Sequence, residues 1–212
     1  FASKHADVVF TGQSSIEEAI IFYNDVKQRA AGYGRSPEDI LILPGCAPII
    51  GQTPDIALAK YQEIVNLVSI EDALNYLGRY FNDIDFTQYD LDKSFPDLGA
   101  FGRNGWESAT DRLKKLAKEE DLTLRELALR TTSPKPPFLG TASEVTDTME
   151  EWFESGASDG YMLNASVLPQ GFNDFIDGVL PELKKRGLFR DSYESDTLHE
   201  NLGLPIPRNR HG

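Results

Sequence analysis

The chain has 212 residues, of which 21 are Lys or Arg and 34 are Asp or Glu, so its formal net charge is −13. The hydrophobic share of 40% is typical of a globular protein and excludes a disordered one. No apolar stretch approaches the ~20 residues that a membrane-spanning helix needs, and a single cysteine cannot form an internal disulfide. The acidic charge disfavours nucleic acid, because phosphates carry the same sign. We expect a cytoplasmic protein of one large domain or two small ones, with no nucleic-acid and no membrane partner.

The amino-terminal segment predicts one β-α unit. Residues 6–11 form a short run of β-branched and aromatic residues that ends at a glycine, which favours a buried strand. Ser15 and Glu18 have the spacing of a capping box, and apolar residues recur behind them at helical spacing up to Gly32. Because the first residue is Phe1 rather than Met, we also expect that processing or the choice of segment removed what preceded it.

A second unit follows the same order. Residues 40–43 predict an apolar strand that ends at Pro44, and residues 49–51 are a candidate extension of that strand. Thr53, followed by a proline, has the pattern of an N-cap with proline at the first helical position. Apolar residues then continue at helical spacing, so a helix is expected here.

Residues 76–106 interrupt this order, because they are dense in Asp, Phe, Tyr, Gly and Pro and show no sustained period. Long loops of this kind are usually functional or mobile, so we interpret the stretch as an insertion rather than as core. Residues 83–88 lack the third acidic ligand and the sixth-position glycine of a calcium loop, and a solvated lid is the favoured interpretation. The aromatic residues of the stretch either cover an apolar substrate or anchor the loop: Phe81, Phe86, Tyr89, Phe95 and Phe101.

The remainder of the chain predicts two further units. Thr141 and Glu144 have the spacing of a second capping box. The expected elements are helices over 107–119, 123–130, 142–155 and 172–186, strands over 138–139 and 159–164, and a tail over about 188–212.

The predicted order is therefore β-α four times, with the insertion between the second and third units. Alternating strands and amphipathic helices predict an α/β fold in which helices cover a parallel sheet. Four units fit either a doubly wound sheet or one half of a (β/α)8 TIM barrel, since a whole barrel takes ~250 residues. The spacing of the predicted elements does not distinguish between these two folds.

Several stretches resemble one enzyme family and occur in that family's order. Residues 2–10, Gly140-Thr141 and residues 152–161 resemble the fifth, seventh and eighth units of the bacterial luciferase-like flavin-dependent monooxygenases. Residues 179–190 and the tail as far as Pro205 resemble the branch of nitrilotriacetate, dibenzothiophene-sulfone and long-chain-alkane monooxygenases. The similarity covers nearly the whole chain. It implies that residues 1–212 form the C-terminal half of a TIM barrel.

The resemblance also implies an activity and its participants. Members of this family are oxidoreductases that oxidise a small organic substrate with O2 and reduced FMN, which a separate flavin reductase supplies. Most flavin contacts in the family come from the first four β-α units, so we expect most of the FMN site to lie outside this chain. The family tends to carry a His in the loop before its Gly-Thr pair, whereas residues 133–137 contain none. We therefore assign no catalytic residue and expect the chain alone to be inactive.

Candidate binding residues follow from the barrel expectation, because active sites of such barrels lie at the C-terminal ends of the strands. These positions are Phe10, Thr11, Cys46 and Asn164. A free cysteine such as Cys46 is more often a buried, inert residue than a nucleophile. The three histidines are not spaced as metal ligands, so we predict no metal site.

A second class of function stays open beside the enzyme. A half-barrel leaves two unpaired sheet edges, which proteins normally pair or cover. In this alternative, the chain is a non-catalytic α/β module that self-associates or binds a partner. In either case we expect a homo-oligomer or a complementing chain.

Overall fold

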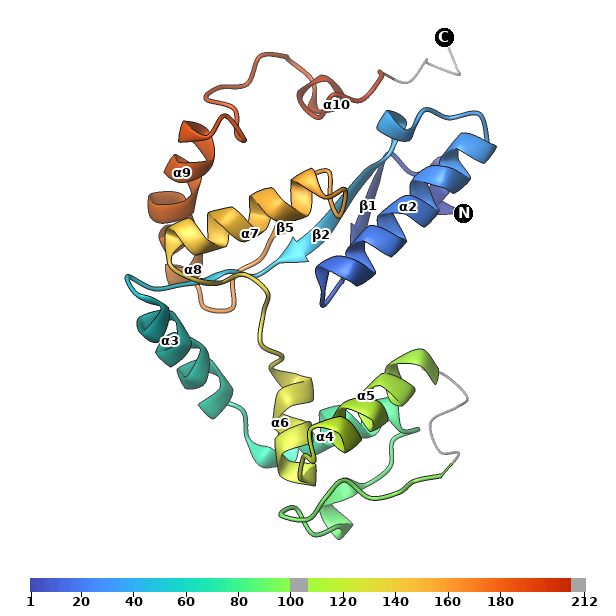
Figure 1. Cartoon of the computed structure of the whole chain (residues 1–212), viewed down its shortest axis with the longest axis vertical. Coiled ribbons are helices and arrows are strands. Elements are labelled where there is room, and N and C mark those ends of the chain that lie inside the picture. The colour runs from blue at the N-terminus through green and yellow to red at the C-terminus, as the bar shows by residue number, and fades with distance from the viewer. Residues whose placement is uncertain (100–106, 207–212) are drawn as a thin grey trace. The chain divides into compact units, whose positions relative to one another are not determined.

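The computed structural model describes residues 1–99 and 107–206 (Figure 1). The described chain divides into two compact units. The first unit comprises Phe1–Leu58 together with the chain from Pro136 onward, and the second unit comprises Ala59–Lys135. Each unit is described here by itself.

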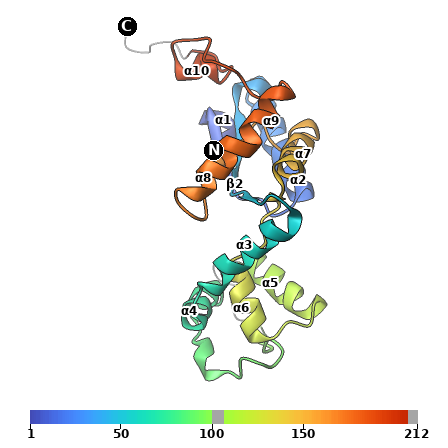
Figure 2. The same cartoon turned by 90° about the vertical axis from the view of Figure 1, so that its left-hand side faces the viewer.

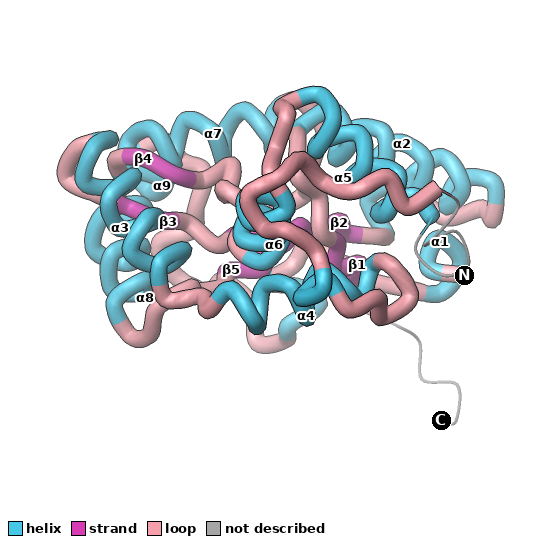
Figure 3. Tube along the Cα trace, turned by 90° about the horizontal axis from the view of Figure 1, so that it is seen from below, coloured by secondary structure: helices cyan, strands magenta, loops and turns pink. Residues whose placement is uncertain are grey.

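The first unit contains all the strands of the described residues, and Figure 3 shows how short these strands are beside the helices. Its strands are β1 (Val8–Thr11), β2 (Leu41–Cys46), β3 (Ile49–Ile50), β4 (Leu139–Gly140) and β5 (Met162–Leu163). Its helices are α1 (Ala2–His5), α2 (Ile16–Gly32), η1 (Pro37–Asp39), α7 (Ala142–Glu154), α8 (Gln170–Asp174), η3 (Phe175–Val179), α9 (Leu180–Lys185) and α10 (Leu198–Asn201). Helix α3 (Pro54–Asn66) crosses the boundary between the units.

All strand pairs are parallel, as the alternation of strands and helices predicts. One sheet has the order β1-β2-β5 and the other pairs β3 with β4. In a half-barrel each strand would pair with the next along the chain, but here β5 pairs with β2 rather than with β4. The short β4 instead pairs with β3, which lies beyond the end of β2. The α/β class is confirmed, and the half-barrel of four units stays a prediction.

The prediction that Pro44 ends the second strand is wrong, because β2 continues through it to Cys46. Pro44 is the last residue that pairs with β1, and pairing with β5 begins at Gly45. The missing N–H of Pro44 therefore falls where one neighbouring strand ends and the other begins. The candidate extension at residues 49–51 is a separate strand, β3, which follows the interruption at Pro48.

Helix starts follow the predicted caps. Ser15 Oγ accepts from Glu18 N at 3.3 Å at the beginning of α2. Thr141 and Glu144 form both bonds of a capping box at the beginning of α7. These helices cover one face of the β1-β2-β5 sheet, where their buried residues pack against residues of β2 such as Ile42 (Figures 1 and 2).

The carboxyl-terminal helix begins earlier than predicted. Residues 170–185 run through α8, the π-helical turn η3 and α9 without a break in the helical assignment. The chain then turns at Gly187, whose φ of +73° is readily adopted only by glycine. The tail includes α10, and its Leu204 is buried.

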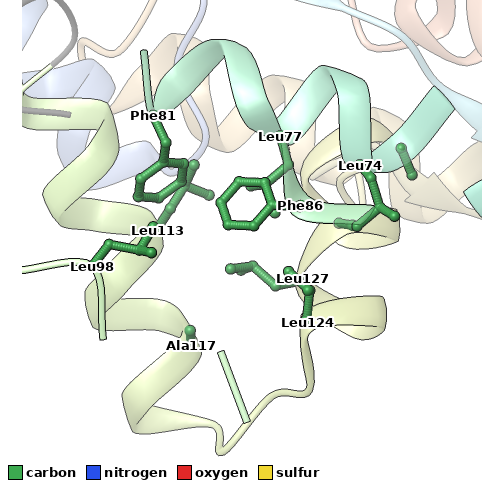
Figure 4. Packing of buried hydrophobic residues seen from close by; sticks show 11 residues of the cluster. Leu74, Leu77, Phe81, Phe86, Leu98, Leu113, Ala117, Leu124 and Leu127 are labelled. Carbon is green, nitrogen blue, oxygen red and sulfur yellow. The ribbon is translucent and has the colours of Figure 1, made fainter. Parts of the chain in front are cut away.

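The second unit is helical in its described residues. Its elements are α4 (Ile70–Tyr80), η2 (Phe86–Gln88), α5 (Glu107–Glu119) and α6 (Leu124–Thr132). Figure 4 shows their apolar side chains pointing toward one another in a single cluster. Phe81 and Phe86 in this cluster are 0% and 1% exposed.

This cluster corrects the interpretation of residues 76–106. Phe81, Phe86 and Phe95 pack inward, so they anchor the segment instead of covering a substrate. The expectation that the stretch is not core is therefore wrong for these residues. Their irregular spacing hid the burial, because Phe81 packs from a turn, Phe86 from the short helix η2 and Phe95 from coil rather than all from one helix face. Tyr89 is 37% exposed and lies against the ring of Phe86, with 5.9 Å between ring centres. Phe101 lies outside the described residues.

Candidate functional site

The four residues predicted at the strand ends lie on three neighbouring strands. Phe10 and Thr11 end β1, Cys46 ends β2 and Asn164 directly follows β5. The backbone N–H of Asn164 donates to Cys46 O at 2.8 Å, which continues the parallel ladder past the end of β5. The carboxyl ends of parallel strands meet at one edge, so these residues share that edge of the sheet. We call it the strand-end site.

Phe10 and Asn164 converge over Gly45. A Cβ on Gly45 would lie 3.2 Å from the ring of Phe10 and 3.4 Å from the side-chain nitrogen of Asn164. Phe10 is 63% exposed, so its ring is presented to solvent rather than packed. Gly45 was not predicted as part of the site. A glycine inside a strand is a known sign of close approach by other groups, and this signal was available in the sequence.

Thr11 and Cys46 are buried, in contrast to Phe10. Thr11 is buried, and its hydroxyl accepts from Gln13 Nε2 at 2.9 Å. Cys46 is 0% exposed and packs with residues of α2 and α7, on the opposite face from Gly45. Burial raises the pKa of the Cys46 thiol to about 12. The thiol is therefore protonated at neutral pH, which argues against a nucleophile.

A buried polar cluster that the sequence did not reveal lies near the start of β2. Lys27 Nζ is 2.8 Å from Asp159 Oδ2 and also donates to the carbonyl oxygen of Ile40 at 2.6 Å. Asp159 accepts from Tyr23 OH at 2.8 Å and from Ile42 N at 2.7 Å. Burial, and then the Asp159 carboxylate, raise the pKa of Tyr23. The partners are far apart in the sequence, so no local pattern pointed to them.

The first unit also contains a cavity of about 590 Å³. It extends from Leu41, the first residue of β2, along β5 to α7 and α9. None of the four predicted residues lines it. Its lining includes Leu43, which pairs with Phe10, and Leu163, which precedes Asn164, so the cavity adjoins the strand-end site.

The strand-end site presents side chains of the kind that could contact a flavin ring. Phe10 presents an aromatic ring, and Asn164 presents an amide that can donate and accept hydrogen bonds. These groups suit a planar, hydrogen-bonding ring system. None of the four predicted residues carries the positive charge that would favour a phosphate, so the site fits the ring rather than the phosphate of FMN.

The described residues hold no group of three or more His, Cys, Asp or Glu that is suited to a metal ion. His5 lies against the ring of Phe1 with 4.9 Å between ring centres, and His199 Nε2 is 3.4 Å from Asp7 Oδ2. Among the residues that the structure describes, no helix has the length and apolar character to cross a membrane.

The chain is similar in sequence to monooxygenases of about twice its length. It is 39% identical over 212 residues to N-acetyl-S-(2-succino)cysteine monooxygenase of Bacillus subtilis (strain 168), a match of 99% of this chain and 48% of the relative. It is 38% identical over 211 residues to nitrilotriacetate monooxygenase component A of Aminobacter aminovorans, covering 98% of this chain and 46% of the relative. The chain thus spans about half the length of these relatives.

Solved structures agree with the sequence similarity. DmoA from Hyphomicrobium sulfonivorans matches with a TM-score of 0.78 and 30% identity, covering 95% of this chain and 42% of that chain. Riboflavin lyase (RcaE), solved with modified FMN and riboflavin, matches with a TM-score of 0.71 and 25% identity over 96% of this chain and 44% of that chain. The family described as luciferase-like monooxygenase matches residues 1–159. The chain therefore belongs to the luciferase-like monooxygenase family, as its sequence motifs predicted.

Proposed function

We propose that this chain supplies the C-terminal half of the (β/α)8 barrel of an FMN-dependent two-component monooxygenase. The complete enzyme oxidises a small organic substrate with O2 and reduced FMN, and a partner flavin reductase supplies the reduced FMN. The observation that carries this proposal is the convergence of Phe10 and Asn164 over Gly45 at the strand ends, in a chain of the luciferase-like monooxygenase family.

Two relatives support the cofactor and the division of labour. The structure of riboflavin lyase contains a modified FMN. The nitrilotriacetate enzyme is designated component A, which fits a system of more than one component. Bound FMN would supply the redox chemistry. Phe10 would lie against its ring, and Asn164 would bind a polar edge of the ring or of the substrate.

The missing phosphate site is consistent with a half-barrel. Since no cation belongs to the strand-end site, a second set of β-α units would have to provide the phosphate contacts. We therefore expect the 212-residue chain to bind FMN weakly on its own.

A chimera tests this proposal. The matching half of nitrilotriacetate monooxygenase component A is replaced by this chain, and FMN binding is measured by quenching of flavin fluorescence. We expect the chimera to bind FMN at least about tenfold more tightly than the 212-residue chain. Phe10→Ala in the chimera should weaken binding, whereas Tyr33→Ala, which removes an aromatic ring that is 58% exposed elsewhere in the first unit, should not. A chimera that folds by circular dichroism but fails to bind FMN would count against the proposal.

A second candidate function rests on a different observation. The sheet face that α2 and α7 leave uncovered carries exposed apolar side chains, among them Val8 and Met162, which are 37% and 46% exposed. Such a face fits a non-catalytic half-barrel that associates with a second copy of itself or with another α/β chain. Tight FMN binding only in the chimera favours the enzyme component, and stable self-association without FMN binding favours this module.

A further inference from the structure

We propose that Gly45 is a positioning residue of the flavin site, which acts through Phe10 and Asn164 rather than by touching the cofactor. Because Gly45 has no side chain, the Phe10 ring and the Asn164 amide both lie close over it, where the flavin ring would contact them. This inference rests on the proposed function and deepens it by naming a residue that sets the geometry of the same site. Its evidence is the place of Gly45 in β2 and the kinds of atoms that surround it.

Gly45 stands where a row of apolar side chains ends. Leu41, Leu43 and Gly45 are alternate residues of β2, so they lie on the same face of the strand, and both leucines are half-buried. Gly45 is aligned with Met162 of the neighbouring strand β5. A glycine inside a strand weakens it, because glycine packs no side chain and loses more backbone entropy than other residues. Such a glycine often marks a place where another group approaches the backbone closely.

Two side chains occupy the space over Gly45. A Cβ at this position would lie 3.2 Å from Cε2 and 3.4 Å from Cζ of Phe10, and 3.4 Å from Nδ2 of Asn164. Carbon atoms in ordinary contact are about 3.5–4.0 Å apart, so a methyl group here would press on the outer edge of the Phe10 ring. The ring is 63% exposed, so it has room to turn away into solvent. The conflict would therefore move the ring and leave the strand in place.

Gly51, a second closely packed glycine of the first unit, has a different kind of neighbour. A Cβ on Gly51 would lie 2.3 Å from the backbone nitrogen of Ala57, so the chain packs there only with glycine. The atoms nearest to Gly45 all belong to side chains. A substitution at Gly45 would therefore displace side chains of the strand-end site, whereas one at Gly51 would displace the backbone.

Asn164 is held more firmly than Phe10. Its backbone N–H donates to Cys46 O at 2.8 Å, and its Nδ2 donates to Met162 O at 3.3 Å. Within residues 1–99 and 107–206, its side-chain oxygen accepts a hydrogen bond from no donor. That oxygen is therefore available to a ring N–H of a flavin. Gly45 thus brings together a fixed hydrogen-bonding group and a movable aromatic ring, and the ring is the part that a substitution at Gly45 would displace.

A double-mutant cycle in the chimera tests the proposal, with FMN binding measured by quenching of flavin fluorescence. We expect Gly45→Ala to raise the dissociation constant for FMN about tenfold, because the displaced Phe10 ring no longer lies against the flavin. Phe10→Leu removes the ring atoms that the new methyl group would meet, so in that background Gly45→Ala should change the dissociation constant less than about twofold. The matched control is Gly160→Ala, where a Cβ would lie 3.1 Å from a side-chain atom of Leu43, and it should have no effect in either background.

A second measurement follows the geometry of the site without the cofactor, because an aromatic ring shifts the NMR signals of nearby protons. In the 212-residue chain, Gly45→Ala should displace the side-chain amide signals of Asn164, as Phe10→Leu does, and should leave the midpoint of thermal unfolding unchanged. A lowered midpoint with unmoved Asn164 signals would mean that Gly45 serves packing alone and would overturn the proposal, as would equal effects of Gly45→Ala in both Phe10 backgrounds. A chimera that binds no FMN would instead overturn the proposed function, and this inference with it.

Discussion

Lys27 and Asp159 form the most buried ion pair that the described residues contain, with side chains that are 9% and 18% exposed. Each charge has further partners: Lys27 donates to two carbonyl oxygens, and Asp159 accepts from Tyr23 and Ile42. Such a pair contributes little net stability compared with apolar residues, but removing one partner leaves the other charge buried. Breaking the pair would leave a buried charge without its partner. The pair therefore holds α2 against the segment that precedes β5.

This argument predicts that Asp159→Asn lowers the free energy of unfolding by about 3 kcal/mol, because the ammonium group of Lys27 loses its counter-charge. Urea unfolding followed by circular dichroism measures the change. Asp25→Asn is the matched control, because its pair with Arg29 is exposed, and it should cost less than about 0.5 kcal/mol. A second substitution, Lys27→Met in the Asp159→Asn background, should restore part of the loss. An Asp159→Asn change as small as that of the control would contradict the argument.

Cys46 predicts a pH dependence. Burial raises the pKa of its thiol from 9.0 to about 12, so the folded chain holds it protonated while the unfolded chain ionises it near pH 9. The stability that this group contributes is fully present below pH 9 and is lost as the pH rises toward 12. Unfolding free energies measured at rising alkaline pH should therefore fall, and they should fall less steeply in Cys46→Ala. Identical slopes for the two proteins would contradict the assigned burial of the thiol.

At the scale of elements, the capping box of α7 is the clearest link between sequence and structure. The hydroxyl of Thr141 accepts from Glu144 N at 3.3 Å, and the Glu144 carboxylate accepts from Thr141 N at 2.8 Å. Thr141→Ala should destabilise the first unit by about 1 kcal/mol, because the backbone N–H of Glu144 loses its acceptor and the Glu144 carboxylate loses the hydroxyl that holds it. Ser143→Ala, an exposed substitution in the same turn, is the control and should change stability by less. Equal thermal melting points for the two variants would argue against the box.

The same elements show what the sequence could predict. Helix α5 occupies Glu107–Glu119 as predicted, because its start, period and length are local properties. Strands were harder, since β4 and β5 each have two residues and depend on partners far along the chain. The pairing of β5 with β2 left no local trace.

The strand-end site, too, could be predicted from the sequence only in part. Its position at the ends of Phe10-Thr11, Cys46 and Asn164 followed from the rule for parallel sheets. Which side chains turn toward one another depends on register, so the approach of Phe10 and Asn164 over Gly45 became visible only in the structure. The opposite orientation of Cys46 follows from strand alternation, once the strand is known to continue past Pro44.

At the scale of the whole molecule, each unit has a hydrophobic cluster of its own. The second unit buries the cluster around Phe81 and Leu127, and the first unit buries clusters around Ile42 and Trp152. Each cluster lies wholly within one unit of the chain. Stability within each unit therefore has a local source, and substitutions in one cluster should first loosen their own unit.

The uncovered face of the β1-β2-β5 sheet predicts how the chain behaves in solution. Val8 and Phe10 are two residues apart along β1 and therefore point to the same face. The register aligns Met162 with Gly45, which places Met162 on that face as well. Their exposures of 37%, 63% and 46% leave apolar side chains uncovered on this face of an open sheet. Such a surface, next to unpaired strand edges, favours association with a second chain.

Sedimentation velocity at increasing protein concentration should therefore show association. The double variant Val8→Lys/Met162→Lys should raise the dissociation constant by at least about tenfold, because charges cannot be buried in an apolar contact. The double variant Ile21→Lys/Tyr33→Lys adds the same charge at exposed positions of α2 and its cap, so it controls for the change in net charge and should associate like the unmodified chain. If the chain stays monomeric at all concentrations, or if both double variants change its association equally, this sheet face is not the contact surface.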